Sequence, residues 1–251
     1  MPKLIILGSA NAISDRAHEN THLVLAGKTN TVLIDCVNNP IMRLEQAGID
    51  FDHLTDVVLT HFHPDHVSGV PQLLMNMWLL GRQRPLNIYG LEHTLGRIEK
   101  VMELYAWSEW PGFFPVVFHR VPEKELVLVL AGEDFKILAS PMQHFIPTIG
   151  LRFEFSSSGK VLAYSCDTEP CPQVIRLAAG ADVLIHEASG PVPGHSSAAQ
   201  AGEAARQAEV GRLYLIHYPT GKFAKGNLVA EAQGRFEGPV IMATDFMSLE
   251  F

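Results

Sequence analysis

The sequence HFHPDH at residues 61–66 constrains this chain more than any other segment, and it directly follows the apolar run TDVVLT. The Val-Val-Leu centre of that run predicts a buried strand. In extended backbone, alternate side chains point the same way, so His61 and His63 can share one metal ion. The proline then turns the chain, and Asp65 and His66 can face a second ion. A histidine-rich surface loop is the alternative, but ligand-type residues at a strand end favour a metal site.

Composition is consistent with this interpretation. Three imidazoles and a carboxylate suit Zn²⁺, with Mn²⁺ or Fe²⁺ as alternatives. The chain has twelve His but only three Cys, too few for a disulfide framework. Its 251 residues, 47% hydrophobic and 18% charged, fit an ordinary globular protein. With no signal peptide or apolar run long enough to span a bilayer, we expect a cytoplasmic protein without a membrane partner.

Short β-type runs and helical runs follow one another without a Gly/Ser/Pro linker, which predicts a single domain over residues 1–251. The residues predict strands at 3–7, 22–26, 31–35, 55–60, 86–89, 126–130, 134–139, 151–155, 161–165, 183–186, 212–217 and 240–244, the last closing the chain. They predict helices at 40–47, 70–80, 91–105, 172–179 and 196–208. This α/β order fits mixed sheets with outer helices better than a doubly wound parallel sheet.

The HxHxDH pattern resembles the metallo-β-lactamase superfamily, and further motifs of that family follow in the same order. They are His144 in SPMQHFIPTIGLRFE, Asp167 in YSCDTEPC, Glu187 in LIHEAS, His195 in GHSSAAQAGEAA and His217 in LYLIHY. Together these motifs are most similar to the ribonuclease Z branch. The resemblance implies a four-layer αββα sandwich of two mixed β-sheets with outer helices.

The same resemblance implies two divalent metal ions. Its ligand sets are His61, His63 and His144 for metal 1 and Asp65, His66 and His217 for metal 2, with Asp167 bridging both. Chemistry agrees with this division, because two ions about 3.5–4 Å apart need a shared carboxylate and hydroxide. Taken alone, His144 and His217 would be read as structural histidines and Asp167 as a turn residue. The presence of HxHxDH favours the ligand interpretation for all three.

The ribonuclease Z pattern also implies a catalytic pair, in which Glu187 orients His195 toward the scissile phosphate. A carboxylate beside an imidazole fixes its tautomer and charge. The residues after His195 begin a predicted helix, whose N-terminal end attracts anions. The simpler alternative is that Ser196 is an N-cap and His195 a loop residue. Asp65 is expected to orient the attacking hydroxide as well as to bind metal.

One departure from the ribonuclease Z pattern bears on the substrate. Full-length members carry a long arm that grips tRNA between the His and Asp motifs, and here residues 145–166 leave room only for a β-hairpin. Residues 81–120 hold several arginines and two of the three Trp. This segment either covers the metal site, where aromatic rings can stack on a base, or packs elsewhere.

These observations predict a dinuclear metal-dependent hydrolase, first of all a phosphodiesterase that uses a metal-bridging hydroxide. The alternatives are a tRNA 3′-processing endoribonuclease, a hydrolase of lactones, carboxylic esters or aryl sulfates, and a non-enzymatic metal-binding module. The net charge of −8 weighs against nucleic acid more than against a small phosphate or other ester. The family resemblance suggests a homodimer.

Overall fold

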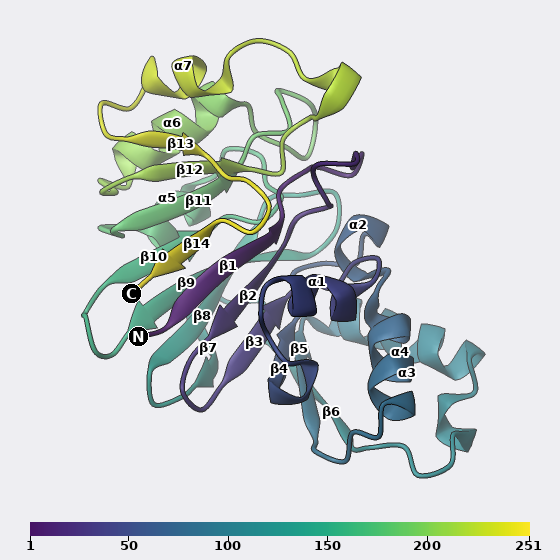
Figure 1. The fold of residues 1–251 in the computed structure, drawn as a ribbon. Helices are drawn as coiled ribbons and strands as arrows, with labels where there is room; N and C mark the ends of the chain where they lie inside the picture. Colours follow the sequence, from purple (N-terminus) through teal and green to yellow (C-terminus); the bar gives the residue numbers. More distant parts are fainter.

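Two mixed seven-stranded β-sheets pack face to face, and helices cover both outer faces (Figure 1). The computed structural model describes residues 1–251. The resulting four-layer αββα sandwich confirms the predicted fold class.

The N-terminal sheet has the order β14-β1-β2-β3-β4-β5-β6. Its strands are β14 (Ser248–Glu250), β1 (Lys3–Gly8), β2 (His22–Ala26), β3 (Thr31–Ile34), β4 (Asp56–Val58), β5 (Leu86–Gly90) and β6 (Val116–Arg120). Pairing is antiparallel from β14 to β3 and parallel from β3 to β6.

The C-terminal sheet has the order β13-β12-β11-β10-β9-β8-β7. Its strands are β13 (Val240–Met242), β12 (Leu213–Ile216), β11 (Val183–Glu187), β10 (Val161–Tyr164), β9 (Thr148–Phe155), β8 (Phe135–Met142) and β7 (Val127–Ala131). Pairing is parallel from β13 to β10 and antiparallel from β10 to β7. Each sheet therefore has a parallel half, and strand ends there can carry functional loops.

Seven α-helices and three short 3₁₀ helices complete the fold. They are α1 (Pro40–Gln46), α2 (Pro64–Val67), α3 (Val70–Leu79), α4 (Glu92–Leu104), α5 (Pro172–Ala178), α6 (Ala198–Gln207), α7 (Leu228–Gln233), η1 (Phe51–His53), η2 (Trp107–Glu109) and η3 (Gly221–Phe223). Side chains of α1, α3 and α4 pack on the outer face of the N-terminal sheet, and those of α6 and α7 pack on the other sheet. No helix is both long enough and apolar enough to cross a membrane.

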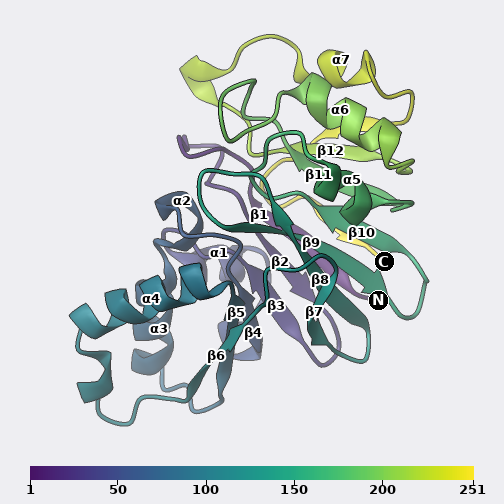
Figure 2. The ribbon, with the colours of Figure 1, turned by 180° about the vertical axis from the view of Figure 1, so that it is seen from behind.

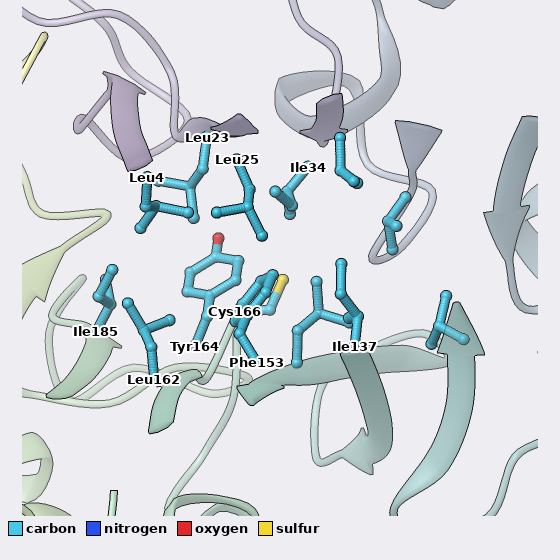
Figure 3. Close-up of a cluster of buried hydrophobic side chains, with 14 of the residues drawn as sticks. Leu4, Leu23, Leu25, Ile34, Ile137, Phe153, Leu162, Tyr164, Cys166 and Ile185 are labelled. Atoms are coloured by element: carbon cyan, nitrogen blue, oxygen red, sulfur yellow. The ribbon is translucent and has the colours of Figure 1, made fainter. Parts of the chain in front are cut away.

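The alternation of side chains along β1 shows why its strand is apolar throughout. Leu4 and Ile6 face the second sheet, whereas Ile5 and Leu7 face the helices, so both faces are buried. Between the sheets, leucine and isoleucine side chains from one meet the rings of Phe153 and others from the opposite sheet (Figure 3). This apolar layer holds the two sheets, and hence the loops at their edges, in fixed positions.

The strand prediction was incomplete near the C-terminus. Residues 240–244 do not close the chain, because β14 follows and pairs antiparallel with β1. The sequence prediction also missed α7 and β6. β14 is three residues long and carries polar ends, so it exists as a strand only through its partner in the sheet.

Within residues 81–120, the aromatic part around η2 lies away from α2 and does not cover the residues next to it. Both views place the segment around η2 beyond the C-terminal end of α4, on the side opposite α2 (Figures 1 and 2). Trp78 and Trp110 stack there with ring centroids 5.0 Å apart. Arg82 is buried and donates hydrogen bonds to backbone carbonyls, including that of Leu54 at 2.7 Å. The aromatic side chains of this segment thus pack against the apolar cluster that α3 and α4 form with the N-terminal sheet.

Candidate metal centre

The predicted ligands converge where strands of both sheets end. His61 follows β4, Asp167 follows β10 and His217 follows β12, all at the carboxyl ends of parallel strands. His144 lies in the β8–β9 connection. Ligand sites of open α/β sheets form at such ends. Because β9 and β10 fill the chain between His144 and Asp167, the long arm is absent, as predicted.

Three imidazole nitrogens meet at the first group. His61 Nε2 lies 3.0 Å from His63 Nδ1, and His144 Nε2 lies 3.2 Å from the same atom. Asp167 belongs to this group, since its Oδ2 lies 3.8 Å from His61 Nε2. Three imidazole nitrogens and a carboxylate oxygen this close together form a donor set that would hold an ion such as Zn²⁺.

The second group lies beside the first and contains Asp65, His66 and His217. Asp65 Oδ2 is 3.6 Å from His66 Nε2 and 3.4 Å from His217 Nε2. Pro64 is the first residue of α2, so Asp65 and His66 lie on its first turn. The predicted turn after the HxH pair is thus a short helix that carries both side chains.

Asp167 lies between the two groups. Its Oδ2 is 3.5 Å from His66 Nε2, and its Oδ1 is 3.5 Å from His217 Nε2. The carboxylate therefore presents oxygen atoms to ligands of both groups, which is the arrangement a bridging position requires.

Unpaired buried atoms test whether a metal fits here. His66 Nε2, His217 Nε2 and Asp167 Oδ1 are buried and have no hydrogen-bond partner. Leaving such atoms unpaired is costly in a protein interior. Divalent cations would give all three atoms a partner, because the atoms face the same region. The residues therefore fit the metal ions that the fold implies.

Asp35 is the important residue that the sequence reasoning missed. Its Oδ2 accepts a hydrogen bond from His66 Nδ1 at 2.7 Å, and its Oδ1 accepts one from the backbone N–H of Thr60 at 2.8 Å. A carboxylate on the far nitrogen leaves Nε2 as the ligand atom and fixes the ring orientation. An aspartate directly after the β3 run TVLI was the available sequence pattern.

Backbone groups and a serine orient two further imidazoles. His144 Nδ1 donates to the Gly194 carbonyl at 2.6 Å, and His217 Nδ1 donates to Ser189 Oγ at 2.8 Å. Gly194 has φ +77°, and a Cβ there would lie 2.6 Å from the ring of Phe145. Glycine is therefore required for the 190–196 loop to reach His144.

Three residues around the centre adopt left-handed backbone conformations although they are not glycine. They are Asp35 (φ 60°), Cys166 (φ 53°) and His217 (φ 53°). Each stands at or just beyond the end of a strand, β3, β10 or β12. Such conformations persist only where the surrounding structure enforces them, and they gather at functional sites.

Glu187 and His195 form the predicted pair. His195 Nδ1 lies 3.0 Å from Glu187 Oε1 and 4.0 Å from Asp167 Oδ2. The backbone N–H groups of Thr168 and Ser189 donate to the two oxygens of Glu187, at 2.9 and 3.0 Å. Glu187 is fully buried and held from several sides, so it can orient the partly exposed His195.

The titration behaviour of the first group favours metal binding. Burial, with help from neighbouring histidines, lowers the pKa of His61, His63 and His144 below the ordinary imidazole value. The neutral ring is the form that binds a metal ion. Burial raises the pKa of Asp167, but His217 and His66 outweigh it and hold that pKa well below the ordinary range, so the carboxylate is charged.

His195 behaves differently from these ligands. Burial lowers its pKa, but the hydrogen bond and charge of Glu187 outweigh burial and raise the pKa above the ordinary value. A protonated imidazole at this position attracts an anion and can donate a proton.

Comparisons with known proteins agree with the fold. Residues 30–218 match the family model described as the β-lactamase superfamily domain. The chain is 26% identical to ribonuclease Z of Methanothermobacter thermautotrophicus, covering 100% of this chain and 97% of the relative. The metallo-β-lactamase fold protein YhfI from Bacillus subtilis superposes with a TM-score of 0.84 at 20% identity, covering 100% and 99% of the two chains. A diphosphatase of the PhnP family superposes with a TM-score of 0.78 at 20% identity, covering 100% and 98%.

Proposed function

The chain belongs to the β-lactamase superfamily and is a ribonuclease Z-like hydrolase, and from this premise we propose that it is a metal-dependent phosphodiesterase. One observation carries the proposal: Asp167 lies between two groups of ligand-type side chains, and the Glu187–His195 pair stands next to them. We further propose that residues 1–251 act as one domain, because both sheets contribute ligands.

His61, His63 and His144 would hold metal 1, Asp65, His66 and His217 would hold metal 2, and Asp167 would be shared by both. Bound divalent ions, Zn²⁺ in the first place and Mn²⁺ or Fe²⁺ otherwise, supply Lewis acidity and a hydroxide at neutral pH. Asp65 orients the nucleophile. His195, held by Glu187, binds a phosphoryl oxygen and gives a proton to the departing alcohol as the P–O bond breaks.

Hydrolysis of bis(p-nitrophenyl) phosphate tests this function. We expect p-nitrophenol release with at least one of Zn²⁺, Mn²⁺ and Fe²⁺, and we expect it to disappear in His63→Ala. No release with any of the three ions contradicts the proposal. A parallel panel of lactones, carboxylic esters and aryl sulfates tests the alternative ester classes, and inactivity toward all esters despite two bound ions supports a non-enzymatic module.

A second candidate, tRNA 3′ processing, is favoured by the name of the ribonuclease Z relative. The missing arm, the net charge of −8 and the burial of Arg82 weigh against it. Cleavage of a precursor tRNA, with affinity that falls steeply as salt rises, supports this candidate. Absence of cleavage at low salt excludes it.

We also propose that the protein is a homodimer that buries the C-terminal ends of α3 and α4. Leu79, Leu80, Leu104 and Tyr105 are all exposed there, and Leu104 is 86% exposed. Apolar side chains gathered at one place are typical of interaction sites. Light scattering on the wild type and on Leu104→Glu measures the mass, and a wild-type monomer contradicts the proposal.

A further inference from the structure

Phe145 is a large apolar side chain beside the metal centre, and no step of the proposed reaction uses it. It directly follows His144 in the β8–β9 connection, and it is 64% exposed. It belongs to none of the buried apolar clusters that hold the sheets and helices together. A single exposed apolar residue is ordinary on a protein surface, but a ring next to ligand-type histidines can contact whatever binds there.

The ring of Phe145 lies next to two histidines of the centre. Its centroid is 5.2 Å from that of His144 and 6.3 Å from that of His195, which it meets edge to face at 75°. His144 is a proposed metal ligand, and His195 is the side chain proposed to give a proton to the departing alcohol. The departing alcohol is therefore the part of the substrate that the ring can reach.

The ring of Phe145 is held in place although it is exposed. Gly194 lies against it, since a Cβ on this glycine would be 2.6 Å from the ring. The backbone N–H of Gly194 donates a hydrogen bond to Glu169 Oε1 at 2.7 Å. The side-chain amide of Gln143, two residues before Phe145, donates to Glu169 Oε2 at 2.8 Å. One carboxylate thus ties the loop against the ring to the chain that carries the ring, so a ligand does not have to order it on binding.

The segments on both sides of this ring are apolar. Ile146 and Pro147 follow Phe145 and are half-buried, whereas residues 191–193, with the sequence Pro-Val-Pro, are exposed. Residues 188–194 contain no charged side chain. Aromatic rings pair favourably with other rings, edge to face or offset, and a charged or strongly hydrated group gains nothing from such a surface. A flat apolar group is therefore the part of a ligand that fits here.

We propose that Phe145 is a specificity-determining residue, which contacts the departing alcohol of the phosphodiester and selects an alcohol that carries an aromatic ring. The inference rests on the proposed phosphodiesterase function. Water adds to phosphorus, the P–O bond to this alcohol breaks, and the alcohol leaves with the proton from His195. Phe145 takes no part in these bond changes and acts only through contact with the ring of the alcohol.

Two phosphonates that cannot be hydrolysed, one with a ring and one without, test the contact. Benzylphosphonate and ethylphosphonate carry the same charged group, and benzylphosphonate places its ring where a phenyl ester would. In calorimetric titration we expect the zinc-loaded wild type to bind benzylphosphonate about tenfold more tightly than ethylphosphonate. Phe145→Ala should lose this preference and bind ethylphosphonate as the wild type does, whereas Phe145→Tyr, which keeps a ring, should retain it. Phe223→Ala, which removes another exposed ring, on η3, should bind both phosphonates as the wild type does.

Methyl p-nitrophenyl phosphate tests the same contact during turnover, because its only ring is on the departing alcohol. We expect Phe145→Ala to raise KM for this diester about tenfold with the metal content unchanged. Phe145→Tyr and Phe223→Ala should keep KM near the wild-type value. An unchanged KM in Phe145→Ala overturns the assignment of the ring to the departing alcohol.

The binding measurement separates this proposal from the proposed function. If the wild type prefers benzylphosphonate but hydrolyses no phosphodiester, the proposed function fails and the aromatic contact stands. Equal weakening of both phosphonates in Phe145→Ala, or a preference that survives in this variant, overturns the proposal. A wild type that binds the two phosphonates alike, or binds neither, overturns it as well.

Discussion

Buried histidines occur in two settings, within the groups of ligand-type side chains at the strand ends and outside those groups. His66 and His217 in the metal centre are as buried as His22 on β2, and all three have an Nε2 atom without a hydrogen-bond partner. His66 and His217 face a shared set of ligand atoms, whereas His22 belongs to no cluster of three or more ligand-type side chains. Burial and an unpaired nitrogen are therefore insufficient to identify a ligand, and convergence with other donors is the decisive property.

The largest effect is expected from removing Asp167, the carboxylate that lies between the two ligand groups. We expect Asp167→Ala to lower phosphodiester hydrolysis at least about 10³-fold and to release bound metal, because both groups lose an oxygen ligand. Elemental analysis after dialysis and p-nitrophenol release measure the two effects. Glu237→Ala, which removes an exposed carboxylate, should change neither. An Asp167→Ala protein that keeps its metal and its activity contradicts the bridging position.

We expect His195 to act beside the metal ligands without being one of them. Its Nδ1 is held by Glu187, but it also stands within ligand distance of Asp167 and His217. We expect His195→Ala to lower kcat about 100-fold with the metal content unchanged, because the lost group acts on the phosphate and the departing alcohol. Loss of one ion in this variant would instead assign His195 to the metal.

The sequence was sufficient for the parts of the site that local patterns determine. HFHPDH indicated the side chains that converge at the centre because strand periodicity and the proline turn act over a few residues. Local patterns did not indicate Asp35 or Ser189, whose partners His66 and His217 are remote in sequence. The same reason explains β14, which depends on β1 at the other end of the chain. Contacts of this kind depend on tertiary packing, which outweighs local propensity.

A smaller effect is expected from changing Asp35, the carboxylate that accepts a hydrogen bond from His66. Asp35→Asn keeps the shape of the side chain but removes the charge that holds His66 Nδ1, so we expect metal affinity to fall about 10–100-fold. Competition with a chromogenic chelator measures it. Asp56→Asn is the matched control, since Asp56 is equally buried and hydrogen-bonded on β4 but contacts no ligand. Equal losses of affinity in both variants would assign the effect to general destabilisation.

His22, which belongs to none of the ligand-type groups, should respond to pH and not to metal. Burial lowers the pKa of His22 to about 4, whereas an unfolded histidine titrates near 6.5. Between these values the unfolded chain binds a proton that the folded chain excludes, so stability falls as the pH falls. We expect His22 to account for about 1 kcal/mol of the free energy of unfolding lost between pH 7 and 5.5. The Nδ2 of His22→Asn can still donate to the Asn20 carbonyl, which His22 Nδ1 contacts at 2.8 Å, but this variant cannot titrate.

Urea unfolding of the metal-free proteins at the two pH values measures the difference between His22→Asn and the wild type. Because the proteins are metal-free, acidification cannot change their stability by releasing metal from the ligand histidines. The titration of those histidines contributes equally to the two proteins and cancels in the difference between them. His53→Asn, which replaces an exposed histidine, should lose as much stability on acidification as the wild type. If His22→Asn loses that amount too, His22 is protonated in the folded protein, and its unpaired Nε2 must have a partner. The distinction between His22 and the histidines of the metal centre would then rest on the convergence of ligand atoms alone.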